Sequence, residues 1–484
     1  MSNAPGGVGH APELKKTLNE LDGYAIGFGA MIGFGWVVLT GGWLEGAGTL
    51  GAVIALATGG LIMLVVSFVY AELASAIPKV GGEHQYLMRG LGARWAFVGS
   101  WGITGGYITI VAFEAVALPR TVEYVFPQIS EQKLYTIFGS DVALWWALIG
   151  AGAALIVTII NYVGIKVAGL VQTFVVLFLV LVGLMLVFGS FTTGTVENME
   201  PLFTDATGLF TVLIVVPFLF VGFDVIPQSA EELRMEPRKI GRLIVISVAM
   251  ATVWYIMTAL TTASSMPLEQ LLGSNLATAD AMGALYNSTL MANVLIAGGA
   301  AGIITSWIAM LIGASRLMYA LAQSGMLPRW FAQLHPKHRT PTNAVLFIGG
   351  LSVLAPFLGE DALGWLVDSG SPSIVLTYML VCVVFLILRR REPEMPRPFR
   401  SGGPTLGRVI GIAGVVLTLC LLSLYIPGMP ASIHPVSYLL CGLWWVLGVV
   451  FLFRIPRGIA PGEDAEARLH AALAGRRRGH DLPA

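Results

Sequence analysis

The sequence predicts an all-α protein that crosses a membrane many times. Of its 484 residues, 56% are hydrophobic and 12% are charged, whereas soluble domains carry roughly a quarter charged residues. Apolar runs long enough to cross a hydrocarbon layer of ~30 Å, which takes roughly 20 residues, recur along almost the whole chain. Lysine and arginine gather in alternate loops between these runs. These observations together predict a polytopic helical membrane protein.

We expect twelve transmembrane helices, one for each apolar run. Their predicted centres are Ile32, Leu64, Ile108, Ala153, Leu179, Phe220, Thr252, Ile308, Leu351, Met379, Val416 and Trp444. If the amino terminus is cytoplasmic, the outer loops hold only Lys133, with Arg120 at the end of the third helix. Basic residues favour the cytoplasmic side. The pattern therefore predicts a multi-pass protein of the cytoplasmic (inner) cell membrane with both termini in the cytoplasm.

No sequence motif indicates catalysis. The chain lacks the Gly-x-Ser-x-Gly elbow, the Gly-x-x-x-x-Gly-Lys phosphate loop, His-Glu-x-x-His and Cys-x-x-Cys. Cys382, Cys420 and Cys441 lie in apolar runs, where cysteine acts as a small hydrophobic filler. The outer loop 127–141 has no cysteine. We therefore expect no enzyme, cofactor, metal site, nucleic-acid partner or disulfide-linked partner subunit.

The first and sixth predicted helices carry residues that interrupt a helix near the bilayer midplane. The first contains GFGAMIGFGW (27–36), and the sixth contains Pro217 and Gly222 in VVPFLFVGFDVIPQ. Such glycines can serve packing alone. Proline removes a backbone donor, however, and unpaired backbone at that depth is tolerated only where it lines a cavity. Matched interruptions in two halves indicate a transporter site, whose freed amides attract an anion and freed carbonyls a cation.

Ionisable residues within apolar helices are functional candidates, because each costs roughly 2.5 to 3.5 kcal/mol at a helix centre on insertion scales. Asp224 could neutralise a substrate ammonium, bind a coupling proton, or tie the sixth helix to a neighbour. Glu114 shares a helix face with Tyr107, seven residues earlier. It is expected to be an outer-vestibule counterion or a solvated interfacial carboxylate. Glu231 and Arg316 lie near the cytoplasmic mouth and are expected to form a gate or a structural contact.

Five segments resemble the amino acid-polyamine-organocation transporter superfamily. They are LKKTLNELDGYAIGFGAMIGFG, YAELASAIPKVGGEHQYL, FLFVGFDVIPQSAEEL, SRLMYALAQSGMLPRWFAQLHPKHRTPTNA and REPEMPRPFR. GFD followed by EE in the third segment is most similar to the cationic amino acid transporter branch. The resemblance implies a leucine-transporter-type fold with a 5+5 inverted repeat and broken helices one and six. It divides the chain into a cytoplasmic segment 1–20, helices one to five (21–192), helices six to ten (193–392), helices eleven and twelve (393–456) and a cytoplasmic tail (457–484).

The resemblance also implies a substrate site. The substrate carboxylate would meet the amides of Gly33, Phe34 and Gly35, and its amino group would meet carbonyls around Phe218 and Val221. The full set of expected substrate-binding residues is Met31, Ile32, Gly33, Phe34, Gly35, Trp36, Tyr107, Phe218, Val221, Gly222 and Asp224. Many relatives carry a small or hydroxyl residue at the position of Phe34 and an aliphatic residue at that of Trp36. These departures indicate a reshaped pocket.

The sequence leaves several coupling ions possible. Proton-coupled relatives often carry a lysine in helix five, where this chain has none around Leu179 and Val180. Coupling or vestibule candidates are Asp224, Glu114, Thr305 and Ser306. A proton could pass through Asp224, sodium could bind near Thr305 and Ser306, or substrates could exchange without net ion flux.

These patterns predict a secondary active transporter, a symporter or antiporter, that moves an amino acid or related small organic amine by alternating access. A first alternative is a carrier of a decarboxylated amine such as ethanolamine or a polyamine. It is favoured by Phe34 together with the acidic Asp224 and Glu114. A second is an amino acid/amine exchanger, or a nutrient sensor that no longer transports. The expected partners are therefore a small amino-bearing substrate, H⁺ or Na⁺, and the lipid bilayer.

Overall fold

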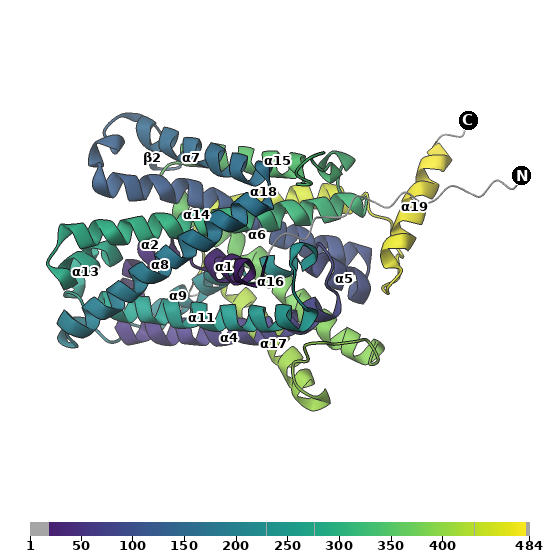
Figure 1. Cartoon of the computed structure of the whole chain (residues 1–484), viewed down its shortest axis with the longest axis horizontal. Helices are drawn as coiled ribbons and strands as arrows, with labels where there is room; N and C mark the ends of the chain where they lie inside the picture. Colours follow the sequence, from purple (N-terminus) through teal and green to yellow (C-terminus); the bar gives the residue numbers. More distant parts are fainter. Residues whose placement is uncertain (1–18, 229, 275, 430, 481–484) are drawn as a thin grey trace, which may run out of the picture.

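Long apolar helices run side by side along the long axis of the molecule (Figure 1). The computed structural model describes residues 19–228, 230–274, 276–429 and 431–480. Most of the predicted segment 1–20 and the last four residues of the predicted tail lie outside this part of the chain. Within it, eleven helical spans are long and apolar enough to cross a membrane. The protein is thus a multi-pass membrane protein.

The elements follow the expected order of apolar runs. The helices are α1 (Glu20–Met31), α2 (Gly35–Val38), α3 (Thr40–Ala47), α4 (Thr49–Ala76), α5 (Glu83–Leu91), α6 (Ala93–Val125), α7 (Leu144–Val163), α8 (Ile165–Thr193), α9 (Ala206–Phe220), α10 (Val225–Gln228), α11 (Pro237–Ala263), α12 (Leu268–Leu272), α13 (Ala277–Tyr286), α14 (Thr289–Gln323), α15 (Thr342–Leu354), α16 (Ala362–Arg391), α17 (Pro404–Leu424), α18 (Pro435–Leu452) and α19 (Ala465–His480). Short 3-10 turns are η1 (Pro127–Ser130), η2 (Glu197–Met199), η3 (Ala230–Glu232), η4 (Arg329–Ala332) and η5 (Ala355–Leu358).

Each of the twelve predicted centres lies in an apolar helix or in the turn that interrupts one. Eleven lie in the long spans, in which α1 with α2 and α9 with α10 count as one span each. The ninth centre, Leu351, lies in the shorter apolar helix Thr342–Leu358, which α15 and η5 form together.

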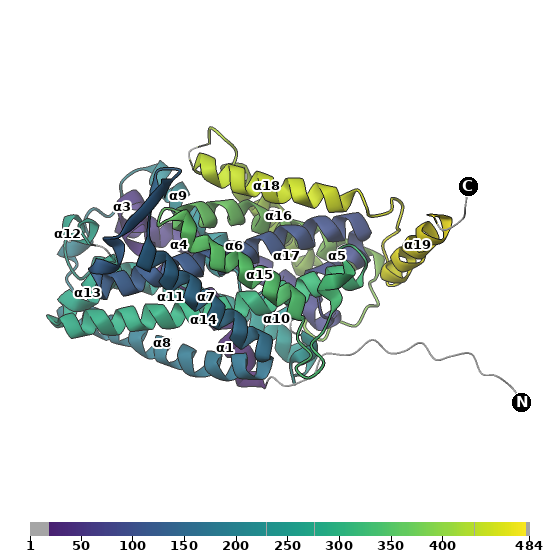
Figure 2. The same cartoon turned by 90° about the horizontal axis from the view of Figure 1, so that it is seen from above.

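The described chain is nearly all helical, as expected, and the loop after α6 departs from this pattern. Strands β1 (Lys133–Ile137) and β2 (Ser140–Ala143) pair there as an antiparallel hairpin, with Ile137 opposite Ser140. Phe138 and Gly139, the two residues between the strands, both have positive φ (50° and 91°). Two such residues form the turn that matches the twist of a hairpin. The hairpin, α12 and α13 lie at one end of the bundle, and α5 and α19 lie at the other (Figures 1 and 2).

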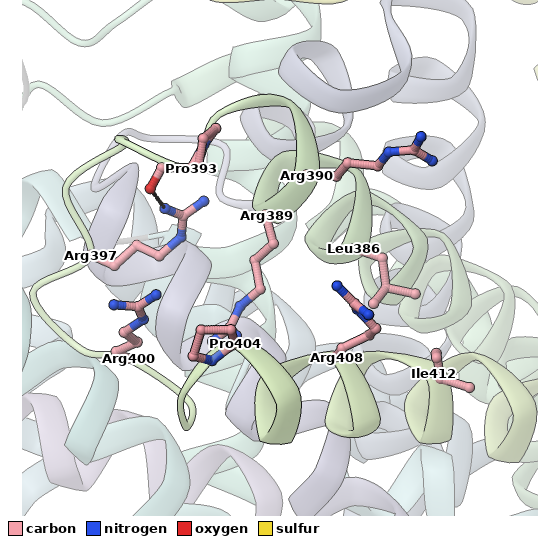
Figure 3. A pocket seen from close by; sticks show the side chains of 9 residues that line it. All are labelled: Leu386, Arg389, Arg390, Pro393, Arg397, Arg400, Pro404, Arg408 and Ile412. Atoms are coloured by element: carbon pink, nitrogen blue, oxygen red, sulfur yellow. Dashed lines mark hydrogen bonds between the residues drawn. The ribbon is translucent and has the colours of Figure 1, made fainter.

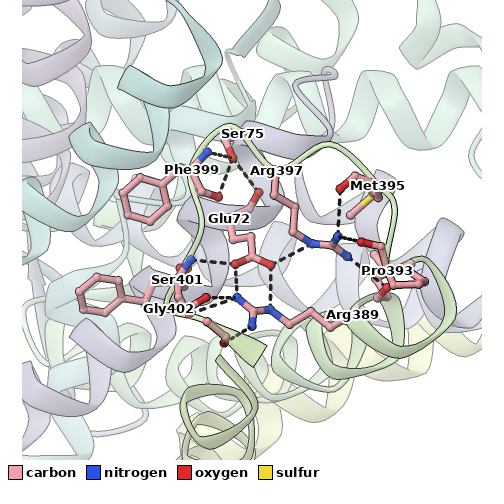
Figure 4. A network of polar contacts seen from close by, with 12 residues as sticks. Glu72, Ser75, Arg389, Pro393, Met395, Arg397, Phe399, Ser401 and Gly402 are labelled. Atoms are coloured by element: carbon pink, nitrogen blue, oxygen red, sulfur yellow. Dashed lines mark hydrogen bonds and ion pairs between the residues drawn. The ribbon is translucent and has the colours of Figure 1, made fainter. Parts of the chain in front are cut away.

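The connector between α16 and α17 is fixed by Glu72, which is completely buried at the end of α4. Arg389 Nε donates to Glu72 Oε1 at 2.9 Å, and Arg397 Nε lies 3.0 Å from the same oxygen. The Ser401 amide donates to Oε2 at 2.8 Å. Figure 4 shows the two guanidinium groups converging on this carboxylate. Glu72 therefore ties α4 to α16 and to the connector.

Candidate functional site

Two broken helical spans touch each other at their breaks. The backbone bonds of α1 end with Ile32 N–H to Phe28 O, and they resume with Val37 N–H to Phe34 O. In the second break, residues 221–224 separate α9 from α10. Gly222 has φ +142°, and a Cβ there would lie 2.6 Å from Ala30 Cβ. The predicted interruptions are confirmed. Glycine is required at position 222 because a Cβ there would collide with the backbone of the first span.

A closed cavity of about 20 Å³ lies between the two breaks. It is lined by Ala30, Met31, Gly33, Phe34, Gly35, Ile110, Phe113, Glu114, Phe218, Leu219, Val221, Tyr255 and Ser306. The volume corresponds to roughly one water molecule. An amino acid can enter only if the surrounding helices move apart. This state of the protein is therefore closed around its candidate site.

The cavity brings together part of the predicted set. Of the predicted substrate-binding, coupling and vestibule residues, those that line it are Met31, Gly33, Phe34, Gly35, Phe218, Val221, Glu114 and Ser306, whereas Ile32, Trp36, Tyr107, Gly222, Asp224 and Thr305 are not among its lining residues. The aromatic ring of Phe218 packs edge-on against that of Phe113, with centroids 5.3 Å apart. Trp36 instead packs against Trp254, with centroids 5.3 Å apart. Trp36 therefore packs against α11 and does not line the cavity.

Glu114 lies against the break in the first span and is only 2% exposed. Its Oε1 accepts a hydrogen bond from the Ser306 hydroxyl of α14. A Cβ at Gly33 would lie 2.5 Å from this oxygen, and the Phe34 amide faces the same carboxyl group. The other oxygen, Oε2, is buried and has no well-formed hydrogen bond within the described chain. The burial excludes a solvated interfacial carboxylate.

Tyr255 of α11 joins the two breaks and was not predicted from the sequence. Its hydroxyl lies 2.5 Å from the Met31 carbonyl and 3.2 Å from the Leu219 carbonyl. The one hydroxyl hydrogen of Tyr255 is therefore shared between two carbonyl groups that lie next to the breaks. The sequence did not indicate this role, because a tyrosine in an apolar helix is not unusual and only the fold places Tyr255 beside both breaks.

Asp224 lies in the second break, is completely buried, and is not among the residues that line the cavity. Its Oδ1 accepts the Gly222 amide at 2.8 Å, and its Oδ2 accepts the Tyr378 hydroxyl of α16 at 3.2 Å. Tyr107 lies beside the same carboxyl group. These contacts correspond to the predicted role that ties the sixth span to a neighbour. A coupling role for Asp224 stays a prediction.

Glu83, at the start of α5, is a further buried carboxyl group that was not singled out from the sequence. It is completely buried, and neither of its oxygens has a hydrogen-bond partner within the described residues. Burial raises the pKa of Glu83 well above its ordinary value, and the nearby charge of Asp224 raises it further. The residue lies between the second and third apolar runs, whose predicted centres are Leu64 and Ile108, and a glutamate between two such runs is normally solvated.

The remaining predicted residues occupy defined places. Thr305 donates to the Gly29 carbonyl at 3.0 Å and to the Gly302 carbonyl at 2.8 Å, so it ties α14 to α1. Glu231 accepts the Val80 amide at 3.1 Å. Arg316 is 1% exposed, and its Nη1 donates to Ser315 Oγ at 3.1 Å. A gate between Glu231 and Arg316 stays a prediction.

Two interrupted spans that cross around a buried pocket define a membrane protein with the architecture of a solute transporter. Comparison with known proteins agrees with this class. The chain belongs to the amino acid permease family, whose sequence profile matches residues 18–452. The resemblance to the amino acid-polyamine-organocation superfamily is thereby confirmed.

The curated relatives are permeases and transporters. The chain is 27% identical over 437 residues to the branched-chain amino acid permease BcaP of Bacillus subtilis, covering 89% of this chain and 92% of that protein. It is 24% identical over 450 residues to a methylthioribose transporter of Bacillus subtilis, covering 92% and 94%. It is 30% identical over 399 residues to cationic amino acid transporter 1 of Arabidopsis thaliana, covering 78% of this chain and 63% of the longer relative.

Proposed function

We propose that the protein is a secondary active transporter that moves an amino acid or related small organic amine across the cell membrane by alternating access. The observation that carries this proposal is the closed cavity between the two broken spans. A cavity of about 20 Å³ must open to admit a solute. A carrier opens such a site to one side of the membrane at a time.

The same proposal assigns roles to the parts of the chain. Residues 21–192 and 193–392 form the two inverted repeats, and 393–456 lie at the periphery. The breaks support this division, because each lies in the first helix of its half. The basic loops favour cytoplasmic termini. Coupling through Asp224, through sodium near Thr305, or by exchange remains part of the proposal, and Glu83 adds a second buried carboxyl group near Asp224.

If the substrate is an amino acid, its carboxylate accepts hydrogen bonds from the amides of Gly33 to Gly35, and its ammonium group donates to carbonyls near Phe218 and Val221. The backbone supports this reading, since the amides between Ile32 and Val37 lie outside the helical ladder. The names of two relatives, a branched-chain amino acid permease and a cationic amino acid transporter, support the same substrate class.

A carrier of amines that lack a carboxylate is a second candidate, and Glu114 favours it. Its carboxyl group already lies beside Gly33 and faces the Phe34 amide. It therefore stands where the carboxylate of an amino acid is expected. Its Oε2, which has no well-formed hydrogen bond within the described residues, would instead attract an ammonium group. The aromatic faces of Phe113 and Phe218 add a favourable wall for a cation.

Uptake into proteoliposomes tests both candidates. Matched labelled pairs would be leucine with isopentylamine, serine with ethanolamine, and lysine with cadaverine. Saturable uptake of one member of a pair supports a carrier and identifies its substrate class. Binding without uptake would support the nutrient sensor and contradict the carrier. If no member of any pair binds or is taken up, the proposed site is rejected.

A further inference from the structure

A second, larger cavity lies where α16 ends and α17 begins, and it shares no lining residue with the cavity between the breaks. It has a volume of about 640 Å³ and opens to the surface. Five arginines line it: Arg389, Arg390, Arg397, Arg400 and Arg408. Figure 3 shows that α16, the connector and α17 all contribute guanidinium groups. No carboxylate is among the described residues that line it.

The positive charge of the cavity is only partly neutralised. Arg389 and Arg397 both pair with Glu72, so two cations share one carboxylate. Arg390, Arg400 and Arg408 are exposed, and no ion pair is found for them within the described chain. Like charges held close together raise the energy of the site, and an anion would relieve that repulsion. Guanidinium groups suit phosphate, because they donate in a planar fork.

The cavity also has an apolar side. Leu386 of α16 and Ile412 of α17 line it beside the arginines. Ile412 continues into an exposed apolar stripe on α17, in which Val409 is 56% and Val416 is 51% exposed. On a helix that crosses a membrane, such a stripe faces lipid chains. The site therefore offers a cationic end and a hydrocarbon end on one continuous surface.

The position of the cavity matches the depth of lipid headgroups. It lies where one transmembrane span ends and the next begins. The distribution of lysine and arginine predicts this end of the bundle to be cytoplasmic. Basic pockets between transmembrane helices on that side can hold anionic headgroups.

We propose that this cavity binds the phosphate headgroup of an anionic phospholipid, with an acyl chain along the Val409, Ile412 and Val416 face of α17. The bound lipid neutralises the arginines that Glu72 leaves unpaired. It also joins α16 to α17 at the connector. A free inorganic phosphate would use the arginines but leave the apolar side unused.

Thermal unfolding of the purified full-length protein in detergent tests this proposal. Phosphatidylglycerol, phosphatidylcholine and inorganic phosphate would be added separately to the wild type. The test variant is the double substitution Arg400→Gln and Arg408→Gln. The control is Arg391→Gln with Arg457→Gln, which removes the same charge from exposed arginines that do not line the cavity.

We expect phosphatidylglycerol to raise the unfolding midpoint of the wild type and of the control, and phosphatidylcholine to leave it nearly unchanged. The test variant should lose most of that rise. Equal responses to the two lipids would overturn the proposal. So would an equal loss in the control, which would indicate a diffuse charge effect, or a rise with inorganic phosphate as large as with lipid, which would indicate an ion site.

Discussion

In the proposed function, Glu114 is the residue that we expect to decide most directly what the cavity binds. A carboxylate buried at the depth of a helix break is costly unless it is protonated or paired. The Ser306 hydroxyl donates a hydrogen bond to Glu114 Oε1, and the Phe34 amide faces the carboxyl group. Glu114 Oε2 has no well-formed hydrogen bond within the described residues. A substrate ammonium would complete the pairing. Under this proposal, the cost of this buried carboxylate is therefore linked to the choice of substrate.

Replacing Glu114 by glutamine keeps the size of the side chain and removes its charge. For an amine substrate, we expect affinity to fall roughly tenfold or more, because a buried ion pair is lost. The measurement is titration of the purified protein with isopentylamine, followed by thermal stabilisation. Glu45→Gln, an exposed glutamate on α3, is the matched control. An unchanged affinity in Glu114→Gln would remove Glu114 from amine recognition.

Tyr255→Phe removes the hydroxyl that bridges the Met31 and Leu219 carbonyls. Leaving buried acceptors unpaired costs about 1 to 3 kcal/mol. We expect a lower unfolding midpoint and slower uptake, since the two breaks lose their shared contact. Tyr162→Phe on α7, where the ring packs against His335, is the control for loss of a hydroxyl. Equal midpoints for Tyr255→Phe and wild type would show that the bridge contributes little.

Glu83 makes stability depend on pH, because burial raises its folded-state pKa above the ordinary value of 4.5. Above pH 4.5 the unfolded chain releases this proton while the folded protein retains it. Stability is therefore fully present below 4.5 and falls as the pH rises toward the folded pKa. Glutamine cannot titrate. The midpoint of Glu83→Gln relative to wild type should therefore increase between about pH 5 and about pH 8.

The control for this pH series is Glu463→Gln, whose carboxyl side chain is 75% exposed. Its midpoint should follow that of the wild type at every pH. A difference between Glu83→Gln and wild type that stays constant with pH would show that the Glu83 proton does not contribute to folding.

At the scale of elements, the sequence predicted the long helices and both breaks. Length and apolarity are almost sufficient to predict a transmembrane span. The glycine cluster at 27–36, and Pro217 with Gly222, mark where the backbone hydrogen bonding of a helix is interrupted. The hairpin at 133–143 was missed, because a short polar loop between spans carries little hydrophobic pattern. Ile110, Phe113 and Tyr255 were missed for another reason. An apolar residue of a buried helix looks the same whether it faces a cavity or a neighbouring helix.

Glu72 joins α4, α16 and the connector between α16 and α17, and its replacement should lower the free energy of unfolding strongly. Glu72→Gln would break its ion pairs with Arg389 and Arg397 and leave both cations near an uncharged amide. Breaking a buried pair in this way costs about 3 to 5 kcal/mol. We expect a large fall in the unfolding midpoint by calorimetry. Glu394→Gln, exposed in the same connector, should change it little, and a comparable fall there would contradict a specific role for Glu72.

At the scale of the whole molecule, the two breaks, the cavity and the Glu114 contact to α14 form one unit. The first span touches α14 so closely that a Cβ at Gly302 would lie 2.4 Å from the Gly33 carbonyl. The first span, α6, α9, α11 and α14 all line the cavity, so opening it requires some of these helices to separate. Such a rearrangement around a fixed site is what alternating access requires.

Counterflow in proteoliposomes tests this central claim most directly, because only a site that alternates between the two sides exchanges labelled for unlabelled solute. The substrate would be the one found in the uptake experiment. We expect counterflow in the wild type and in Gly42→Ala, where an added Cβ meets no described atom within 4 Å. Gly33→Ala should abolish it, since its Cβ would lie 2.5 Å from Glu114 Oε1 and 2.7 Å from Ser306 Oγ. Undiminished counterflow in Gly33→Ala would contradict a substrate site at the crossing of the two breaks.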